Sequence, residues 1–107
     1  MKKRTLLIAL LSAFSAPYAM AQANNKPLRI IVAFAPGGPV DAMARTIAEP
    51  LGKSLGRTVI VENKPGASGA IGAGEVLKSE ADGSVMWLTS VGAAAINPAL
   101  FPKLTYN

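Results

Sequence analysis

A short apolar segment runs through a glycine-rich turn into an amphipathic segment, and this junction constrains the fold more than any other feature of the chain. The segment Leu28–Phe34 is short and rich in β-branched residues, which is typical of a buried strand. After the turn Ala35–Asp41, apolar residues recur at helical spacing, which predicts a helix from about Asp41 to Leu55. A strand, a tight turn and a helix in this order are typical of the start of a βαβ unit.

The same alternation continues along the chain with short connections. Thr58–Glu62 predicts a second strand, the segment from Gly66 predicts a helix that runs to Lys78, and Val85–Thr89 predicts a third strand. This order predicts an α/β fold with a three-layer βαβαβ arrangement, a parallel sheet and right-handed crossovers. Ligands bind such sheets at the carboxyl ends of the strands. The segments expected to meet at that edge are 35–41, 64–69 and the residues from Ser90 onward.

The residue inventory excludes most kinds of chemistry. The chain contains no His and no Cys, which excludes a His-containing triad, the usual zinc sites, a thiol nucleophile and a disulfide. Of the six carboxylates, only Glu80 and Asp82 lie close together, in a turn-like segment where a solvated role is expected. We therefore expect no enzymatic activity, no catalytic residue, no metal site and no cofactor.

Residues 1–21 have the pattern of a signal peptide. Lys2–Arg4 precede a short apolar core, and Ala19–Ala21 supplies the small residues that signal peptidase requires. The apolar run is shorter than the ~20 residues that span a bilayer. We expect cleavage after Ala21 or after Ala23, and a mature periplasmic chain over residues 22–107; an uncleaved anchor is the alternative.

Export changes the charge balance. The whole chain carries a net charge of +5, of which Lys2–Arg4 supply three, so eight basic and six acidic residues remain from Gln22 onward. The remaining basic residues are scattered and do not alternate with aromatic ones. We therefore expect no nucleic-acid partner.

The first glycine-rich turn is the best candidate for an anion site. Free backbone N–H groups at Gly37 and Gly38, together with the dipole of the following helix, favour a bound anion. Asp41 either caps this helix or contacts an amine or hydroxyl of a ligand. The residues alone leave both roles open.

The second glycine-rich segment approximates two known motifs and matches neither. Its glycines lie at positions 66, 69, 72 and 74, which is not the G-x-G-x-x-G order of dinucleotide-binding turns. Gly66–Ala70 approximates a nucleophile elbow, but its last residue is Ala and no His can act as the base. Ser68 is therefore expected to hydrogen-bond a ligand or to cap the second helix.

Several spaced segments together resemble one family. These segments are Lys26–Arg45, Leu55–Gly69, Ala81–Gly83 and Ala95–Phe101. In these segments the mature chain is similar to the Bug-type receptors, which are the periplasmic substrate-binding proteins of tripartite tricarboxylate transporters. The last segment is like that family's Asn-Pro-x-Leu-aromatic element.

The resemblance implies a two-lobed periplasmic binding protein that closes on a small carboxylate-bearing solute and delivers it to the membrane components of a transporter. Family members are much longer than this chain, so residues 22–107 are expected to form an incomplete amino-terminal lobe. In the family, the loops after the strands hold the carboxylate through backbone groups and ordered waters. The ligand-binding residues expected by position are Phe34, Ala35, Pro36, Gly37, Gly38, Asp41, Ser68, Gly69, Ser90, Gly92, Ala93 and Ala94.

Other functions remain compatible with the sequence. A small periplasmic enzyme would depend on a catalytic Ser or Asp and would tolerate the loss of Gly37 and Gly38. A structural module, or a truncated fragment, would bind no small molecule. The identity of the carboxylate is not readable from the chain, because both lobes would contribute to selectivity.

Overall fold

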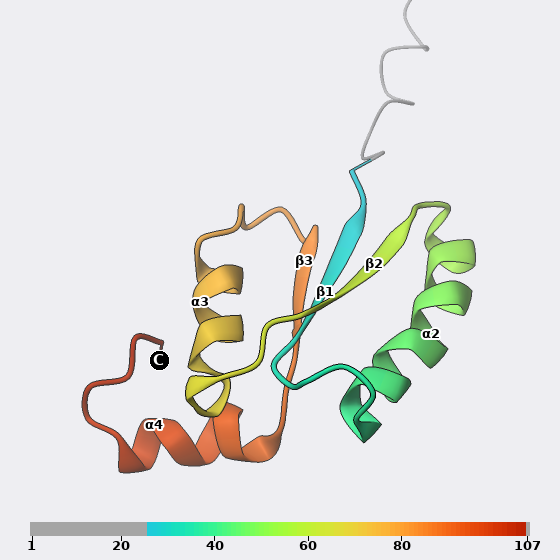
Figure 1. Cartoon of the computed structure of the whole chain (residues 1–107). Coiled ribbons are helices and arrows are strands. Elements are labelled where there is room, and N and C mark those ends of the chain that lie inside the picture. Colours follow the sequence, from blue (N-terminus) through green and yellow to red (C-terminus); the bar gives the residue numbers. More distant parts are fainter. Residues whose placement is uncertain (1–25, 107) are drawn as a thin grey trace, which may run out of the picture.

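A computed structural model describes residues 26–106 (Figure 1). The predicted signal peptide and both predicted cleavage positions lie outside these residues. Within them, no helix is both long enough and apolar enough to cross a membrane.

Three strands form one parallel sheet. They are β1 (Leu28–Val32), β2 (Val59–Asn63) and β3 (Val85–Leu88), in the order β2-β1-β3. Leu28 lies opposite Val59 in one pairing, and Arg29 lies opposite Val85 in the other. The predicted parallel sheet is confirmed. The strand limits differ slightly from those predicted, mainly because β1 ends at Val32 and not at Phe34.

The two long helices cover opposite faces of the sheet (Figure 1). Helix α2 (Pro39–Leu55) connects β1 to β2, and helix α3 (Ala70–Leu77) connects β2 to β3 on the far side of β1. Because the second connection reverses the direction of the first, two right-handed crossovers must lie on opposite faces. This arrangement gives the predicted three layers. Three short elements follow the strand ends: the 3₁₀ turn η3 (Ala67–Gly69), the wide turn η4 (Gly92–Ile96) and helix α4 (Asn97–Leu100).

The two faces of the sheet are packed differently. On the α2 face, Ile30, Val32 and Ala44 form a fully buried apolar cluster. On the α3 face, the helix approaches closely because Gly72 has no side chain: a Cβ there would lie 3.2 Å from Trp87 Nε1. An apolar core thus fixes α2, whereas small residues let α3 lie close to the sheet.

Charged groups flank the sheet away from its carboxyl edge. Arg29 donates to both Glu62 oxygens at 2.6 and 2.7 Å and to Glu75 at 2.9 Å, and these bonds lower the pKa of both carboxyl groups. Lys26 Nζ lies 2.7 Å from Glu80 and 3.0 Å from Asp82. The carboxylates that are close in the sequence, Glu80 and Asp82, therefore lie in an ion-paired turn, with the Glu80 side chain 78% exposed, as expected for a solvated role.

Candidate functional site

A hollow of about 380 Å³ opens where the carboxyl ends of the three strands meet. It lies where the connections change direction: β1 leads to β2 on one side of it, and β2 leads across to β3 on the other side. Ligands of open α/β sheets bind at such a switch point. The residues that line it are Ala33, Phe34, Ala35, Pro65, Gly66, Ser68, Gly69, Ser90, Gly92, Ala93 and Asn97.

Two backbone bonds mark the ends of the strand pairings beside the hollow. The N–H of Ala33 donates to the carbonyl of Leu88 at 3.1 Å, and the N–H of Lys64 donates to the carbonyl of Val32 at 2.8 Å. These bonds lie at the carboxyl ends of the strand pairings, and beyond them the chain enters the loops that line the hollow.

Some of the predicted site residues line this hollow and others do not. Those that do are Phe34, Ala35, Ser68, Gly69, Ser90, Gly92 and Ala93; those that do not are Pro36, Gly37, Gly38, Asp41 and Ala94. The list of expected ligand-binding residues lacked Ala33, Pro65, Gly66 and Asn97, although the last three lie in the segments expected at this edge. Pro65 and Gly66 follow the second strand, and Asn97 belongs to the Asn-Pro element, so both signals were present in the sequence.

The hollow offers neutral hydrogen-bonding groups. No charged side chain is among its lining residues within 26–106; the side-chain groups are the hydroxyls of Ser68 and Ser90 and the amide of Asn97. Ser90 Oγ accepts a bond from the N–H of Ala93 at 3.3 Å. Behind Gly69, Thr89 Oγ1 is buried without a hydrogen-bond partner among the described residues. Such a wall can hold a carboxylate through backbone N–H groups, hydroxyls and water.

The turn between β1 and α2 is closed by Asp41. The helix begins at Pro39 with Gly38 as its N-cap, so the predicted start at Asp41, and its role as N-cap, are wrong. Proline favours the first helical position because its φ is already helical, and this moves the start of the helix forward. The Asp41 carboxylate instead reaches back and accepts a bond from the N–H of Gly37 at 2.9 Å.

Asp41 is also held from two other directions. Arg45 Nε donates to its oxygens at 3.0 and 3.1 Å, and Asn63 Nδ2 donates at 2.9 Å. Three hydrogen bonds lower the pKa of this carboxyl group to about 2. The bond from Arg45 has the largest effect on the pKa, followed by those from Gly37 and from Asn63. The side chain is buried and both oxygens are engaged, which favours this internal role over direct contact with a solute. Because Gly37 already donates to Asp41, its N–H is not free for an anion; Gly38 makes no such bond.

The turn after β2 has a different construction. Its four residues all have positive φ, at 117° for Gly66, 46° for Ala67, 54° for Ser68 and 95° for Gly69. The N–H of Gly69 donates to the carbonyl of Gly66 at 3.0 Å. Helix α3 has Gly69 as its N-cap and no side-chain cap bond, so the suggestion that Ser68 caps it is wrong. A hydrogen bond from Ser68 to a ligand stays a prediction.

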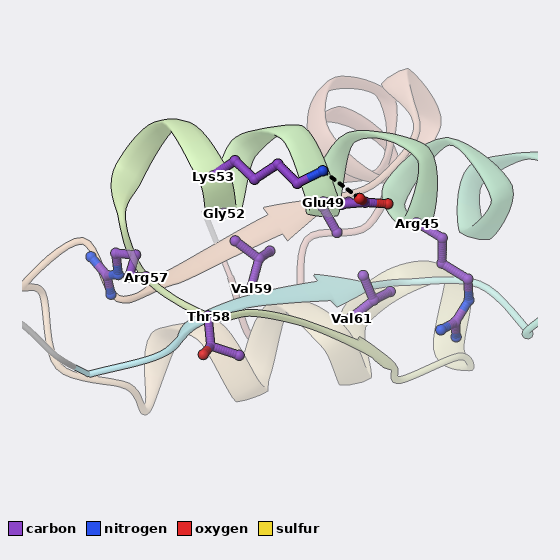
Figure 2. Close-up of a pocket in the computed structure, with 9 residues that line it drawn as sticks. Arg45, Glu49, Gly52, Lys53, Arg57, Thr58, Val59 and Val61 are labelled. Carbon is purple, nitrogen blue, oxygen red and sulfur yellow. Dashed lines mark hydrogen bonds and ion pairs between the residues drawn. The ribbon is translucent and has the colours of Figure 1, made fainter.

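A second hollow, of about 440 Å³, lies between α2 and β2 (Figure 2). None of the predicted site residues lines it. Lys53 and Glu49 form an exposed ion pair at 2.6 Å across its rim, and Arg45 is bonded to Asp41. Arg57, which also lines it, has no ion-pair partner among the described residues, and its Nε and one terminal nitrogen make no hydrogen bond there. The carboxyl-end hollow is the better candidate because the loops after all three strands line it, as expected for an open α/β sheet. Residues 26–106 contain no cluster of His, Cys, Asp or Glu suited to a metal ion.

Comparison with known proteins agrees with this geometry. The family model described as tripartite tricarboxylate transporter family receptor matches residues 43–107. Protein BugT of Bordetella pertussis is 38% identical over 110 residues, which is 96% of this chain and 34% of BugT. This chain therefore spans about a third of the length of that relative.

Solved structures share this fold with the chain, among them a periplasmic binding protein. The structure of MatC from Rhodopseudomonas palustris with bound malate is 37% identical, with a TM-score of 0.70 over 76% of this chain and 28% of that one. The structure of the periplasmic binding protein BugD is 46% identical, with a TM-score of 0.54 over 57% of this chain and 20% of that one. With the family match, these similarities show that the chain belongs to the receptor family of tripartite tricarboxylate transporters, as a Bug-type member.

Proposed function

We propose that this chain forms part of an extracytoplasmic solute receptor that binds a small carboxylate in the hollow at the carboxyl ends of β1, β2 and β3. The observation that carries this proposal is the hollow itself, which the loops after all three strands line with neutral donors. The related MatC structure contains bound malate, which supports a carboxylate as the ligand. In this proposal the receptor acts in the periplasm, is not an enzyme, and passes its solute to membrane components of a transporter.

The proposal assigns the predicted residues to two groups. Phe34, Ala35, Ser68, Gly69, Ser90, Gly92 and Ala93 would form the wall of the solute site. Gly38 would offer its N–H from the neighbouring turn, while Asp41 supports that turn from behind. Pro36, Gly37 and Ala94 would shape the rim.

The chain alone would bind weakly. A single neutral hydrogen bond contributes only about 0.5–1.5 kcal/mol in water, and this hollow is open to solvent. The relatives are about three times as long as this chain, and a second lobe closing over the site would exclude water and strengthen each bond. Binding should therefore be measured on the protein in the length in which the cell produces it.

Two substitutions test the location of the site. Ala35 is exposed at the hollow, so Ala35→Leu should fill it without disturbing the core. Gly38 has an ordinary φ of −81°, and an added Cβ would meet Ala35 O at 3.6 Å, so Gly38→Val should fold. Ala42→Leu makes the same change as Ala35→Leu on the exposed surface of α2 and serves as the control.

Calorimetry with malate as the probe distinguishes the outcomes. We expect Ala35→Leu and Gly38→Val to weaken binding at least tenfold, a loss of about 1.4 kcal/mol, while Ala42→Leu binds as the wild type does. If only Gly38→Val weakens binding, the solute site lies at the β1–α2 turn and not in the hollow. If the wild-type protein binds neither malate nor other small di- and tricarboxylates, the receptor proposal fails and a non-binding role is favoured.

Export is tested separately. We propose that residues 1–21 act as a cleavable signal peptide, because Lys2–Arg4 precede a short apolar core that ends in Ala19–Ala21. Mass spectrometry of a periplasmic fraction should find a mature protein that begins at Gln22 or at Asn24. An intact amino terminus beginning at Met1 in the cytoplasm would contradict this.

A further inference from the structure

The turn Gly66–Gly69 adopts a backbone conformation that its own sequence does not favour. Ala67 and Ser68 have φ values of 46° and 54°, and they are the non-glycine residues with positive φ in the described part of the chain. A Cβ disfavours this region of φ and ψ, so such a conformation persists only where surrounding contacts hold it. Some contact outside the turn must therefore stabilise it.

One side chain supplies that contact. Asn97, the first residue of α4, donates from Nδ2 to the carbonyl of Ser68 at 2.9 Å. The other bond across the turn, from the N–H of Gly69 to the carbonyl of Gly66, is internal to it. The N–H of Ala70, the next residue, donates to the carbonyl of Ala67. Among residues 26–106, Asn97 thus supplies the side-chain hydrogen bond on the distorted residues, and it comes from 29 positions along the chain.

Asn97 is itself oriented by Tyr106. The Asn97 amide nitrogen lies 3.4 Å from the Tyr106 hydroxyl, which donates to the carbonyl of Ala93 at 2.8 Å. The Tyr106 ring is buried and packs edge-on against Trp87 of β3, with ring centres 5.4 Å apart and an interplanar angle of 75°. A continuous series of contacts therefore joins the sheet to the carbonyl of Ser68.

The bond between Asn97 and Ser68 also lies between two hollows. Both residues line the proposed solute site, and both line a neighbouring, more apolar hollow of about 510 Å³ that residues 101–105 complete. Movement of the turn would change the wall of the solute site. The position of Ser68 and Gly69 therefore matters for the shape of that site.

We propose that Asn97 is a positioning residue of the solute site: its amide holds Ser68 and Gly69 in the left-handed conformation in which they line the hollow, and Tyr106 orients that amide. The inference rests on the proposed function for its effect on binding. Its effect on the turn itself does not depend on any ligand.

Two substitutions at Asn97 distinguish the loss of the donated hydrogen bond from the loss of side-chain volume. Asn97→Ala removes the donor at every pH. Asn97→Asp places an ionised carboxylate against the Ser68 carbonyl at neutral pH, but its protonated form can donate to that carbonyl. Hydrogen bonding to the neutral form raises a carboxyl pKa, so lowering the solution from about pH 7.5 to about pH 4, near the ordinary pKa of Asp, should restore the bond in part.

Binding of malate is measured for each variant and expressed as the ratio of its Kd to that of the wild type at the same pH, which cancels the titration of malate. We expect both variants to bind about tenfold more weakly at neutral pH, the effect of one lost hydrogen bond at the upper end of its usual size. The ratio for Asn97→Asp should fall toward one in acid, whereas that for Asn97→Ala should not. Tyr106→Phe, which keeps the ring on Trp87, should lose less.

Hydrogen exchange at the N–H of Gly69 reports on the turn without a ligand. That N–H donates within the turn, so its exchange should accelerate in Asn97→Ala and, less, in Tyr106→Phe. Ser79→Ala is the matched control, because it removes a comparable bond, from Ser79 Oγ to the carbonyl of Glu75 at 2.9 Å, outside the residues that line the hollow. It should change neither binding nor exchange at Gly69.

The outcomes separate the two proposals. If the wild type binds malate and both Asn97 variants bind equally well with unchanged exchange at Gly69, the inference is overturned and the receptor function stands. Weaker binding without faster exchange, and without recovery of Asn97→Asp in acid, overturns it too. If the wild type binds no carboxylate, the function fails and exchange at Gly69 alone decides the inference. Should Asn97→Ala not fold, Tyr106→Phe carries the same test.

Discussion

Two glycine-containing turns lie at the same edge of the sheet and are stabilised in opposite ways. The turn between β1 and α2 is held by Asp41, only four positions from Gly37, with Arg45 one helical turn further on. The turn after β2 has four residues with positive φ, and its side-chain hydrogen bond comes from Asn97. The first turn is therefore held mainly by its own helix, with added bonds from Asn63 of β2 to Asp41 and to the carbonyl of Phe34. The second turn takes its side-chain bond from a segment that follows β3 and has to fold onto it.

Breaking the first turn should have the largest effect on stability. Asp41→Asn keeps the size of the side chain but removes the charge that Gly37, Arg45 and Asn63 all donate to. Hydrogen bonds to buried charged groups are stronger than neutral ones, so we expect a larger loss of unfolding free energy than for any glycine change below. Urea denaturation measures it. A loss no greater than that of Gly37→Ala would show that the turn does not depend on Asp41.

The wild type and Asp41→Asn should also differ in how their unfolding free energy depends on pH. The pKa of Asp41 is lowered from 3.8 to about 2 in the folded protein. Its contribution to stability should therefore be fully present above about pH 4 and be lost as the pH falls from 3.8 toward 2. The difference in unfolding free energy between the wild type and Asp41→Asn should shrink over that range. A difference that stays constant would mean that the Asp41 pKa is ordinary.

Alanine substitutions at two glycines compare the turns directly. Gly37 and Gly69 both have positive φ, at 86° and 95°, but a Cβ at Gly37 meets nothing within 4 Å, whereas one at Gly69 would lie 2.8 Å from the Ala93 Cβ. We expect Gly37→Ala to lose about 1 kcal/mol from backbone strain. Gly69→Ala should lose a further 1–3 kcal/mol, roughly, from overpacking. Equal losses, measured by thermal or urea unfolding, would mean that the second turn is free to move away from Ala93.

The smallest expected effect is a gain. Ala67 has a φ of 46°, which glycine adopts without penalty, so Ala67→Gly should relieve strain in the second turn. The greater freedom of glycine in the unfolded chain offsets part of this, which leaves a stabilisation of at most about 1 kcal/mol. Ala70→Gly is the control, because Ala70 has an ordinary helical φ of −63° and should be destabilised instead. A loss in both variants would show that the turn is not strained.

The comparison also explains how far sequence reasoning reached. Alternating strand and helix patterns predicted the parallel sheet, its three layers and the meeting of the loops at one edge, because periodicity and chain connectivity determine these features. They did not predict the order β2-β1-β3, since apolar periodicity does not encode which strands are neighbours.

Within the site, local signals were more informative than remote ones. The glycines marked both turns, but nothing in a sequence indicates that Ala67 and Ser68 adopt positive φ, because residues with a Cβ normally avoid it. The helix start was placed at Asp41 because Asp is a good N-cap, although Pro39 was the stronger signal. The bond from Asn97 to Ser68 joins residues 29 positions apart, and it emerges only from the three-dimensional arrangement.

The central place of β1 has a consequence for how this chain folds over time. Leu28 pairs with Val59 and Arg29 with Val85, so the strand that is synthesised first has no partner near it in the sequence. High contact order slows folding, because the entropy of closing long loops is lost before the pairing is gained. We expect β1 to lack its first partner until residues beyond Asn63 are available, and its second partner until residues beyond Leu88 are available. A central strand that waits for both partners keeps its backbone N–H and C=O groups open to pairing with other chains until the sheet is complete.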